Sequence, residues 1–335
     1  MNVFIEGPAW MGYWSEVTES ALQNLGHTTG LHYHNNKPIK SRISRALVKL
    51  LPVLSRLGFT SDWSAISNRN LLRTMGHNKW DVLISIQGKI DRDTAEKIRQ
   101  NNPGIKIAYW WGDALREKAI KRLDEVYPLV DALLFAFKGD CEDFIAKGRS
   151  KAMFFPVGVS KDYHTGFTIT DKDRKKFTCD ISFVGTCHPE RCKVLQEISR
   201  KSKTPITVWG RGWRRCKGIH SKGRLKMQDT LKVHACSRIA LNLHQEGTNN
   251  GFNIRFFEIP AANGFEICDW QPEMDNIPAG KFIASFRSID ELVEKIQYYL
   301  SHEDAREAMR KGAHDAVLQY ELYEIRFAEL LRKLR

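Results

Sequence analysis

Short apolar runs alternate with amphipathic stretches along the whole chain. The opening residues predict a strand, a loop containing glycine, and a helix that Ser15 would cap and Gly26 would end. Further predicted elements are strands at 80–87, 105–113, 131–137 and 152–159 and a helix at 91–102. Strands that are apolar throughout, with helices between them, predict a parallel sheet that is covered on both faces.

A second series of the same kind begins at Cys179, after a polar stretch at 160–178 that is typical of a linker. It comprises a strand, a Gly-Thr turn and a helix within 179–201, a strand at 205–213, a helix at 226–237, a strand at 239–245, a helix at 254–264, a strand at 265–269 and a charged helical tail from 288 to 335. Two α/β halves of similar size favour a ligand in a cleft between them, outside the carboxyl ends of the strands.

Composition agrees with two folded domains, because 335 residues with 42% hydrophobic side chains can form two cores. The sequence shows no apolar run long enough for a membrane span and no secretory signal. Its seven cysteines are irregularly spaced, so we expect free thiols rather than a disulfide framework, and a cytoplasmic location. The spacing in "CHPERC" (187–192) does not fit the common zinc sites, so no metal is expected.

The net charge of +13 indicates an anionic partner. The excess is concentrated in two segments. Residues 191–226 contain twelve basic side chains and only one acid, Glu197, and residues 37–73 contain eight and only one acid, Asp62. Nucleic acid, a membrane surface and a phosphorylated substrate all remain open as partners.

Several segments resemble one family when they are taken in order. They are "YWWGD" (109–113), "FFPVGVSKDYH" (154–164), "DISFVGT" (180–186), "ITVWGRGW" (206–213), "SRIALNLHQ" (237–245) and "GFNIRFFEIPAANGF" (251–265). This order is similar to the CgeB-like, spore-maturation type of GT-B glycosyltransferases, and the similarity covers nearly the whole chain.

The resemblance implies a GT-B fold with two Rossmann-like domains facing each other across a cleft. Residues 1–165 would form the acceptor-side domain and residues 166–318 the nucleotide-sugar-binding domain. Residues 319–335 would form a helix that crosses back onto the first domain. The donor would be a UDP-, GDP- or TDP-sugar, and no other cofactor is implied.

A nucleotide-diphosphate sugar needs positive donors for its phosphates and an acceptor for its ribose hydroxyls. Gly185 and Thr186 would turn from a strand into a helix N-terminus, whose free N–H groups favour phosphate, with Arg191 close behind. The alternative is an ordinary strand-to-helix turn with a solvent-facing arginine. Gly210 and Arg211 belong to a basic loop suited to the same anion.

The resemblance also bears on the acids of 251–269. In retaining GT-B enzymes a Glu-x7-Glu pattern places its second acid before "AxxxG". Here that position is Glu258, which we expect to bind the ribose; a solvated helix glutamate is the alternative. The first acid is replaced by Asn250, so the stereochemistry stays open. Asn253 and Arg255 would contact the diphosphate.

Candidates for a catalytic base are Asp113 at the end of a predicted strand, Glu6 after the first strand, and His244. Asp113 could instead cap a helix, and His244 could instead be a core histidine. Trp10, Trp14, Trp110 and Trp111 are candidate stacking surfaces for an acceptor.

The acceptor has two competing interpretations. Residues 40–59 predict an amphipathic basic helix, interrupted by Pro52, that would lie at the inner face of a membrane and bring the enzyme to a lipid-linked or cell-surface glycan. The alternative packing is against its own domain. Residues 209–227 are basic and aromatic, which favours DNA with hydroxymethylated bases as a second acceptor. A non-catalytic GT-B binding protein is a third interpretation; no obligate protein partner is readable.

Overall fold

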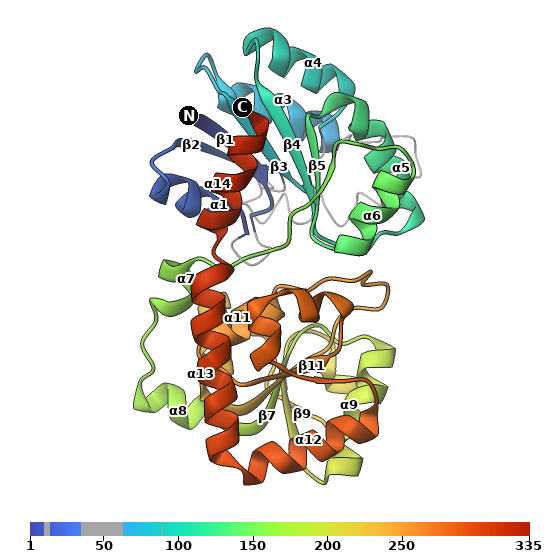
Figure 1. Ribbon diagram of the computed structural model, residues 1–335, viewed down its shortest axis with the longest axis vertical. Helices are drawn as coiled ribbons and strands as arrows, with labels where there is room; N and C mark the ends of the chain where they lie inside the picture. Colours follow the sequence, from blue (N-terminus) through green and yellow to red (C-terminus); the bar gives the residue numbers. More distant parts are fainter. Residues whose placement is uncertain (10–13, 35–62, 89) are drawn as a thin grey trace, which may run out of the picture. The chain divides into compact units, whose positions relative to one another are not determined.

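The computed structural model describes residues 1–9, 14–34, 63–88 and 90–335 (Figure 1). Within these residues the chain divides into two compact units. The first unit comprises Met1–Phe135, Lys147–Met153 and Leu334–Arg335, and the second comprises Ala136–Ala146 and Phe154–Lys333.

The first unit is built on a sheet that, in the described part of the chain, has six strands in the order β2-β1-β3-β4-β5-β6. Neighbouring strands from β2 through β5 pair in parallel. The strands are β1 (Asn2–Gly7), β2 (Thr28–Tyr33), β3 (Val82–Ile86), β4 (Lys106–Trp111), β5 (Ala132–Phe135) and β6 (Ala152–Phe154). The helices are α1 (Trp14–Asn24), α3 (Trp63–Met75), α4 (Arg92–Asn101), α5 (Glu117–Val126) and the 3-10 turn η1 (Tyr127–Leu129).

The second unit contains a six-stranded sheet of its own, in the order β12-β11-β10-β7-β8-β9 among the described residues. All five neighbouring pairs are parallel. Its strands are β7 (Cys179–Val184), β8 (Ile206–Trp209), β9 (His220–Ser221), β10 (Ser237–Asn242), β11 (Glu266–Asp269) and β12 (Ala284–Phe286). Its helices are α6 (Lys138–Ala146), α7 (Lys161–Thr165), α8 (Asp171–Phe177), α9 (Pro189–Ser202), α10 (Met227–Cys236), α11 (Arg255–Ala261), α12 (Ile289–Ser301), α13 (Glu303–Tyr320) and α14 (Tyr323–Leu334), with 3-10 turns η2 (Trp213–Arg215), η3 (Pro272–Asn276) and η4 (Pro278–Phe282).

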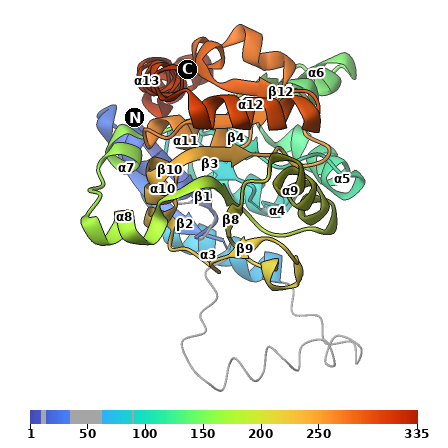
Figure 2. The same cartoon turned by 90° about the horizontal axis from the view of Figure 1, so that it is seen from below.

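Apolar strands form the centre of both units because helices cover both faces of each sheet. Every residue of β3 and β5 is buried. In the second unit, Leu195 and Ile198 of α9 and Leu292 of α12 pack into the core on one face of the sheet. Phe177 of α8 and Val233 of α10 pack in a separate cluster with Trp209. Figure 2 shows α9 and the pair α8 and α10 on opposite sides of β8 and β10.

Strand order determines where each sheet offers a ligand site. In the second unit, reading from β9 to β12, the order is β9-β8-β7-β10-β11-β12, which is the Rossmann order. The order reverses direction between β7 and β10, and ligands of such sheets bind outside the carboxyl ends of the strands at that switch point. In the first unit the corresponding switch lies between β1 and β3.

Two local expectations are wrong, and a third concerns residues outside the described part of the chain. Ser15 does not cap α1: the helix begins at Trp14, and the Ser15 hydroxyl donates to the Pro8 carbonyl at 3.0 Å. The stretch 160–178 is not an extended linker, because it contains α7 and α8, and a capping box of Thr170 and Asp173 starts α8. The amphipathic segment 40–59 lies outside the described residues. In the described part of the chain, no helix combines the length and apolar character needed to span a bilayer.

Candidate donor site in the second unit

Arg191 lies at the switch point of the second sheet. Its Nη1 donates to the carbonyl oxygen of Thr186, just beyond β7, at 2.9 Å, and its Nη2 reaches that of Leu243, just beyond β10, at 3.5 Å. The guanidinium also stacks over the Phe183 ring, 5.3 Å from the centroid. Burial lowers the pKa of Arg191. The sequence therefore places a fixed cation at the position where a Rossmann-like sheet binds its ligand.

The turn after β7 differs in detail from the expectation. The Gly185 amide donates to the Trp209 carbonyl and the Cys187 amide donates to the Arg211 carbonyl, so neither is free for a phosphate. Helix α9 begins only at Pro189. Gly210 packs against this turn so closely that a Cβ would lie 1.9 Å from the Gly185 carbonyl oxygen, and its φ is 144°. Only glycine fits there.

Arg255 and Glu258 form an ion pair on the first turn of α11. Glu258 is fully buried, which rules out the solvated helix glutamate of the alternative interpretation. Its Oε2 is bound by Arg255. Its Oε1 is buried, has no hydrogen-bond partner among the described residues, and lies 3.9 Å from His164 Nε2. Burial lowers the pKa of His164 to about 4 and that of Arg255 to about 10. At neutral pH Arg255 is therefore charged and His164 is neutral.

Asparagines connect this helix to the sheet. The Asn253 Oδ1 accepts the amides of Arg255 at 2.9 Å and Phe256 at 3.3 Å, at the start of α11, while its Nδ2 donates to Asn242 Oδ1 at 2.9 Å. Asn242 in turn donates to Glu266 at 2.8 Å. Glu266 lies on β11, as expected for an acid that does not belong to the Glu-x7-Glu pattern. Burial raises its pKa well above the ordinary value.

Asn250 occupies the position of the first acid in the Glu-x7-Glu pattern. Its hydrogen bonds hold the loop that precedes α11. It adopts a left-handed backbone with φ of 49°. Its Oδ1 accepts the Glu273 amide and its carbonyl accepts the Lys138 amide, each at 2.8 Å.

His244 forms a dyad with Asp269 at the carboxyl ends of β10 and β11. The His244 Nδ1 lies 3.0 Å from Asp269 Oδ1, which also accepts the His244 amide at 2.7 Å. Burial opposes ionisation of Asp269, but the hydrogen bonds from His244 and Gln271 outweigh it and lower the pKa of the Asp269 carboxyl. An ionised Asp269 holds the proton of His244 on Nδ1. The Nε2 atom is buried and has no hydrogen-bond partner in the described part of the chain.

In the first unit, Glu6 lies at the corresponding switch point. Its carboxylate is buried, accepts the Ser85 hydroxyl of β3, and lies 3.2 Å from His34 Nδ1. A Cβ at Gly88 would lie 1.8 Å from Glu6 Oε2, so the chain closes tightly over this acid.

The aromatic candidates separate into different environments. Trp110 is 0% exposed and Trp14 is 9% exposed, and their rings meet edge to face with centroids 4.6 Å apart. Both are core side chains, so the expectation that they stack on an acceptor is wrong. Trp111 is partly exposed, and Trp10 lies outside the described residues. Asp113 is exposed and does not cap a helix, because α5 has Arg116 as its N-cap.

A basic cavity of about 860 Å³ lies beside Gly210, at the carboxyl end of β8. Its basic side chains are Arg211, Arg214, Arg215, Lys222 and Arg224, and no acidic residue lines it. None of the ion pairs among the described residues involves these five. Trp213 of the same loop is buried, with its indole N–H donating to the Gly185 carbonyl at 2.8 Å, so it is not a stacking surface.

A disulfide between Cys192 of α9 and Cys216 anchors this basic loop. The expectation that every cysteine is a free thiol is therefore wrong. The described residues contain no cluster of three or more histidine, cysteine or acidic side chains suited to a metal ion.

Sequence reasoning missed Asp269, Asn242, His164 and His34. Asp269 could have been predicted, because it is the last residue of the predicted strand 265–269 and His244 is the second-last residue of the predicted strand 239–245. The partners that bring Asn242, His164 and His34 to these sites are Asn253, Glu258 and Glu6, which lie 11, 94 and 28 residues away along the chain.

Comparison with known proteins agrees with this architecture. Residues 191–332 match a family model described as "Glycosyl transferase-like". None of the curated proteins searched matches the chain.

Several solved structures match over the full length. A glycosyltransferase from Rickettsia africae has a TM-score of 0.65 at 12% identity and covers 99% of this chain and 97% of its own. A trehalose-6-phosphate synthase has a TM-score of 0.68 at 13% identity, with 99% of both chains covered. A structure from E. coli, described as bound with UDP-2-fluoro glucose, has a TM-score of 0.66 at 12% identity and covers 100% and 99%. The chain therefore has the GT-B fold, and the family match supports a glycosyltransferase.

Proposed function

We propose that this protein transfers a sugar from a nucleotide-diphosphate sugar to a hydroxyl group, and that the second unit binds the donor. The observation that carries the proposal is the Arg255–Glu258 pair, in which one oxygen of a fully buried carboxylate has no hydrogen-bond partner among the residues that the structure describes. A buried acceptor without a donor is costly, so a ligand hydroxyl that satisfies Oε1 would stabilise it. The ribose of a nucleotide offers such hydroxyls.

The cations at the same edge of the sheet would bind the diphosphate. Arg191 is fixed at the switch point by two carbonyl oxygens, and Arg255 stays charged at neutral pH. We assign Arg191 and Arg255 to the diphosphate and Glu258 to the ribose. Gly185, Thr186, Gly210, Arg211, Asn250 and Asn253 would complete the donor site.

The His244–Asp269 dyad is the proposed proton-transfer group. With Nδ1 bonded to Asp269, Nε2 is the ring nitrogen that would accept the proton of the acceptor hydroxyl, as a general base does. Glu6 and Asp113 of the first unit are the alternative bases. We assign no stereochemistry to this chain.

For the acceptor we propose an anionic, lipid-linked or cell-surface glycan, with the first unit as the acceptor side. The five cations beside Gly210, which form no ion pair with any described residue, support an anionic molecule. The same cations support duplex DNA as the second candidate. We also propose that residues 1–165 form the acceptor-side domain, residues 166–318 the donor-binding domain, and residues 319–335 a helix that crosses back onto the first domain. We propose further that the protein is related to the CgeB-like group.

The test is a screen of UDP, GDP and TDP and their sugars for thermal stabilisation and hydrolysis. A nucleotide at one hundred times its dissociation constant adds about 2.7 kcal/mol of stability. If no nucleotide shifts the melting temperature, the enzyme proposal is wrong; stabilisation without turnover on any acceptor would favour a non-catalytic binding protein. Binding to DNA should weaken steeply with salt, whereas association with lipid keeps an apolar component.

A further inference from the structure

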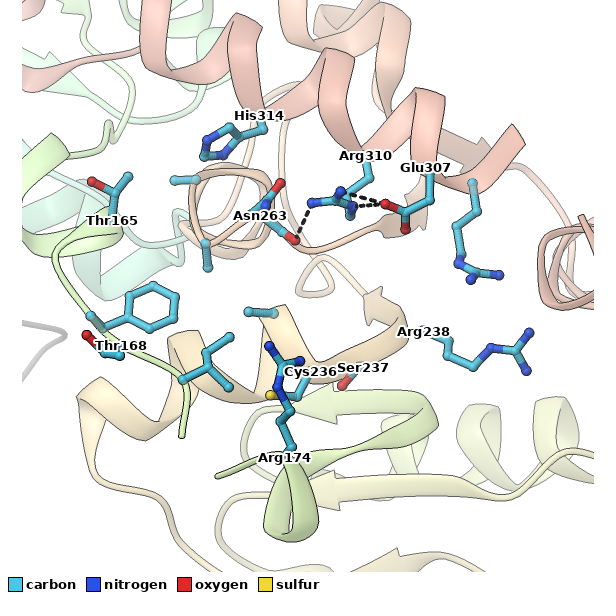
Figure 3. Close-up of a pocket in the computed structure, with 16 residues that line it drawn as sticks. Thr165, Thr168, Arg174, Cys236, Ser237, Arg238, Asn263, Glu307, Arg310 and His314 are labelled. Atoms are coloured by element: carbon cyan, nitrogen blue, oxygen red, sulfur yellow. Dashed lines mark hydrogen bonds and ion pairs between the residues drawn. The ribbon is translucent and has the colours of Figure 1, made fainter. Parts of the chain in front are cut away.

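A second cavity, of about 760 Å³, lies at the opposite edge of the second sheet (Figure 3). Ser237, the first residue of β10, lines it, whereas Asn242, the last residue, belongs to the donor edge. Six strand residues span about 20 Å. We call this space the amino-edge cavity; a molecule bound in it is separate from the proposed donor.

The lining of the cavity is rich in arginine. Arg174, Arg238, Arg306 and Arg310 line it together with one carboxylate among the described residues, Glu307. Three of these arginines form ion pairs: Arg238 with Asp180, Arg306 with Glu303 and Arg310 with Glu307. Arg306, Arg310 and His314 are spaced four residues apart on α13 and so share one face of that helix. This spacing directs a row of nitrogen-bearing side chains toward the cavity.

Protein contacts hold the α13 arginines in place. Arg306 Nη1 donates to the Tyr299 carbonyl at 2.6 Å. Arg310 Nε donates to Glu307 at 2.8 Å and its Nη1 to the Asn263 carbonyl at 3.3 Å. A guanidinium has five N–H donors, so these bonds orient each group without exhausting its donors. Such a fixed cation loses little side-chain entropy when an anion binds.

Arg174 is the cation that a ligand would engage. Within the described residues its guanidinium makes no ion pair and no hydrogen bond, and Figure 3 shows it rising from α8 toward Cys236 and Ser237, while Arg310 descends from α13 toward Asn263. Apolar side chains, including Phe167 and Ile169, line the same space. The cavity therefore combines charge-assisted donors with an apolar surface.

We propose that the amino-edge cavity binds a small organic phosphate, with Arg174 and Arg310 contacting the phosphate and the apolar side chains contacting the organic part. Arginine forks match the geometry of phosphate oxygens, and the volume suits a ligand of nucleotide or sugar-phosphate size.

Cys236 supplies a readout specific to this cavity, because it is a partly buried free thiol in the lining. We would follow its alkylation by iodoacetamide with peptide mass spectrometry while titrating AMP, glucose 6-phosphate, inorganic phosphate or glucose. We expect an organic phosphate to protect Cys236 at lower concentration than inorganic phosphate, and glucose to give no protection. Failure of both organic phosphates to protect, or equal protection by inorganic phosphate, would overturn the proposal.

Two charge-reversal variants locate the effect. Arg174→Glu should raise the half-protecting concentration about tenfold or more, the loss expected for a charge-assisted hydrogen bond. Lys175→Glu changes the same charge on the same exposed helix but at a residue that does not line the cavity, and it should leave that concentration within about twofold. Equal shifts in both variants would contradict a specific site. The experiment uses neither a donor sugar nor turnover, so its outcome is independent of the proposed glycosyl transfer.

Discussion

Glu258→Gln tests the donor site most directly. Glutamine keeps the shape of the side chain but removes its negative charge. With the amide oxygen facing Arg255, the NH2 group takes the place of the acceptor Oε1. A hydrogen bond to a charged group contributes about 1.5–3 kcal/mol, which corresponds to roughly a 10- to 150-fold change in affinity. We therefore expect the dissociation constant of the preferred nucleotide to rise by that factor.

The assay is calorimetric titration of the nucleotide that gives the largest thermal shift. Glu266→Gln controls for the substitution of a buried glutamate in the second unit that is bound by an amide, Asn242, and not by an arginine. Urea unfolding of both variants separates affinity from stability, since removing one member of a buried ion pair destabilises a protein by about 3–5 kcal/mol. If folded Glu258→Gln binds the nucleotide as tightly as the unaltered protein, the ribose assignment is wrong.

Three further predictions concern stability and are each checked by urea unfolding. Burial raises the pKa of Asp140 from 3.8 to about 6; because the folded state then binds more protons than the unfolded one, its contribution to stability falls as pH rises from about 4 to about 6. Asp140→Asn should lack this fall, whose upper limit is about 3 kcal/mol, and identical pH profiles would contradict the burial argument. The Cys192–Cys216 disulfide closes a loop with a sequence separation of 24, so a reductant should lower the free energy of unfolding by about 3 kcal/mol. The reductant should not change the free energy of unfolding of Cys192→Ser. If it also leaves that of the unaltered protein unchanged, the disulfide is absent. Trp110→Ala should cost about 3–5 kcal/mol, as expected for a core aromatic, and a loss below about 1 kcal/mol would conflict with its burial.

Much of the fold could be predicted because its signals are local. Apolar runs such as 80–87 and 131–137 became buried strands, since a strand covered on both faces must be apolar at successive positions. Helix ends were harder to predict. Ser15 is a residue type that often caps helices, but it lies within the helix and its hydroxyl donates to the Pro8 carbonyl. The local sequence pattern does not predict this contact.

The candidate site, like the fold, could be predicted only in part from the sequence. The sequence by itself was enough to select the candidate residues Arg191, Arg255 and Glu258. Arg191 follows a predicted strand-to-helix turn, and the resemblance to the Glu-x7-Glu enzymes selects Glu258, with Arg255 near the start of the same predicted helix. Only the tertiary structure decided that Trp110 and Trp213 are core side chains, that His244 is held by Asp269, and that the Gly185 amide is already bonded. Burial and pairing depend on residues that are distant along the chain, and a local pattern contains no information about which of them will meet.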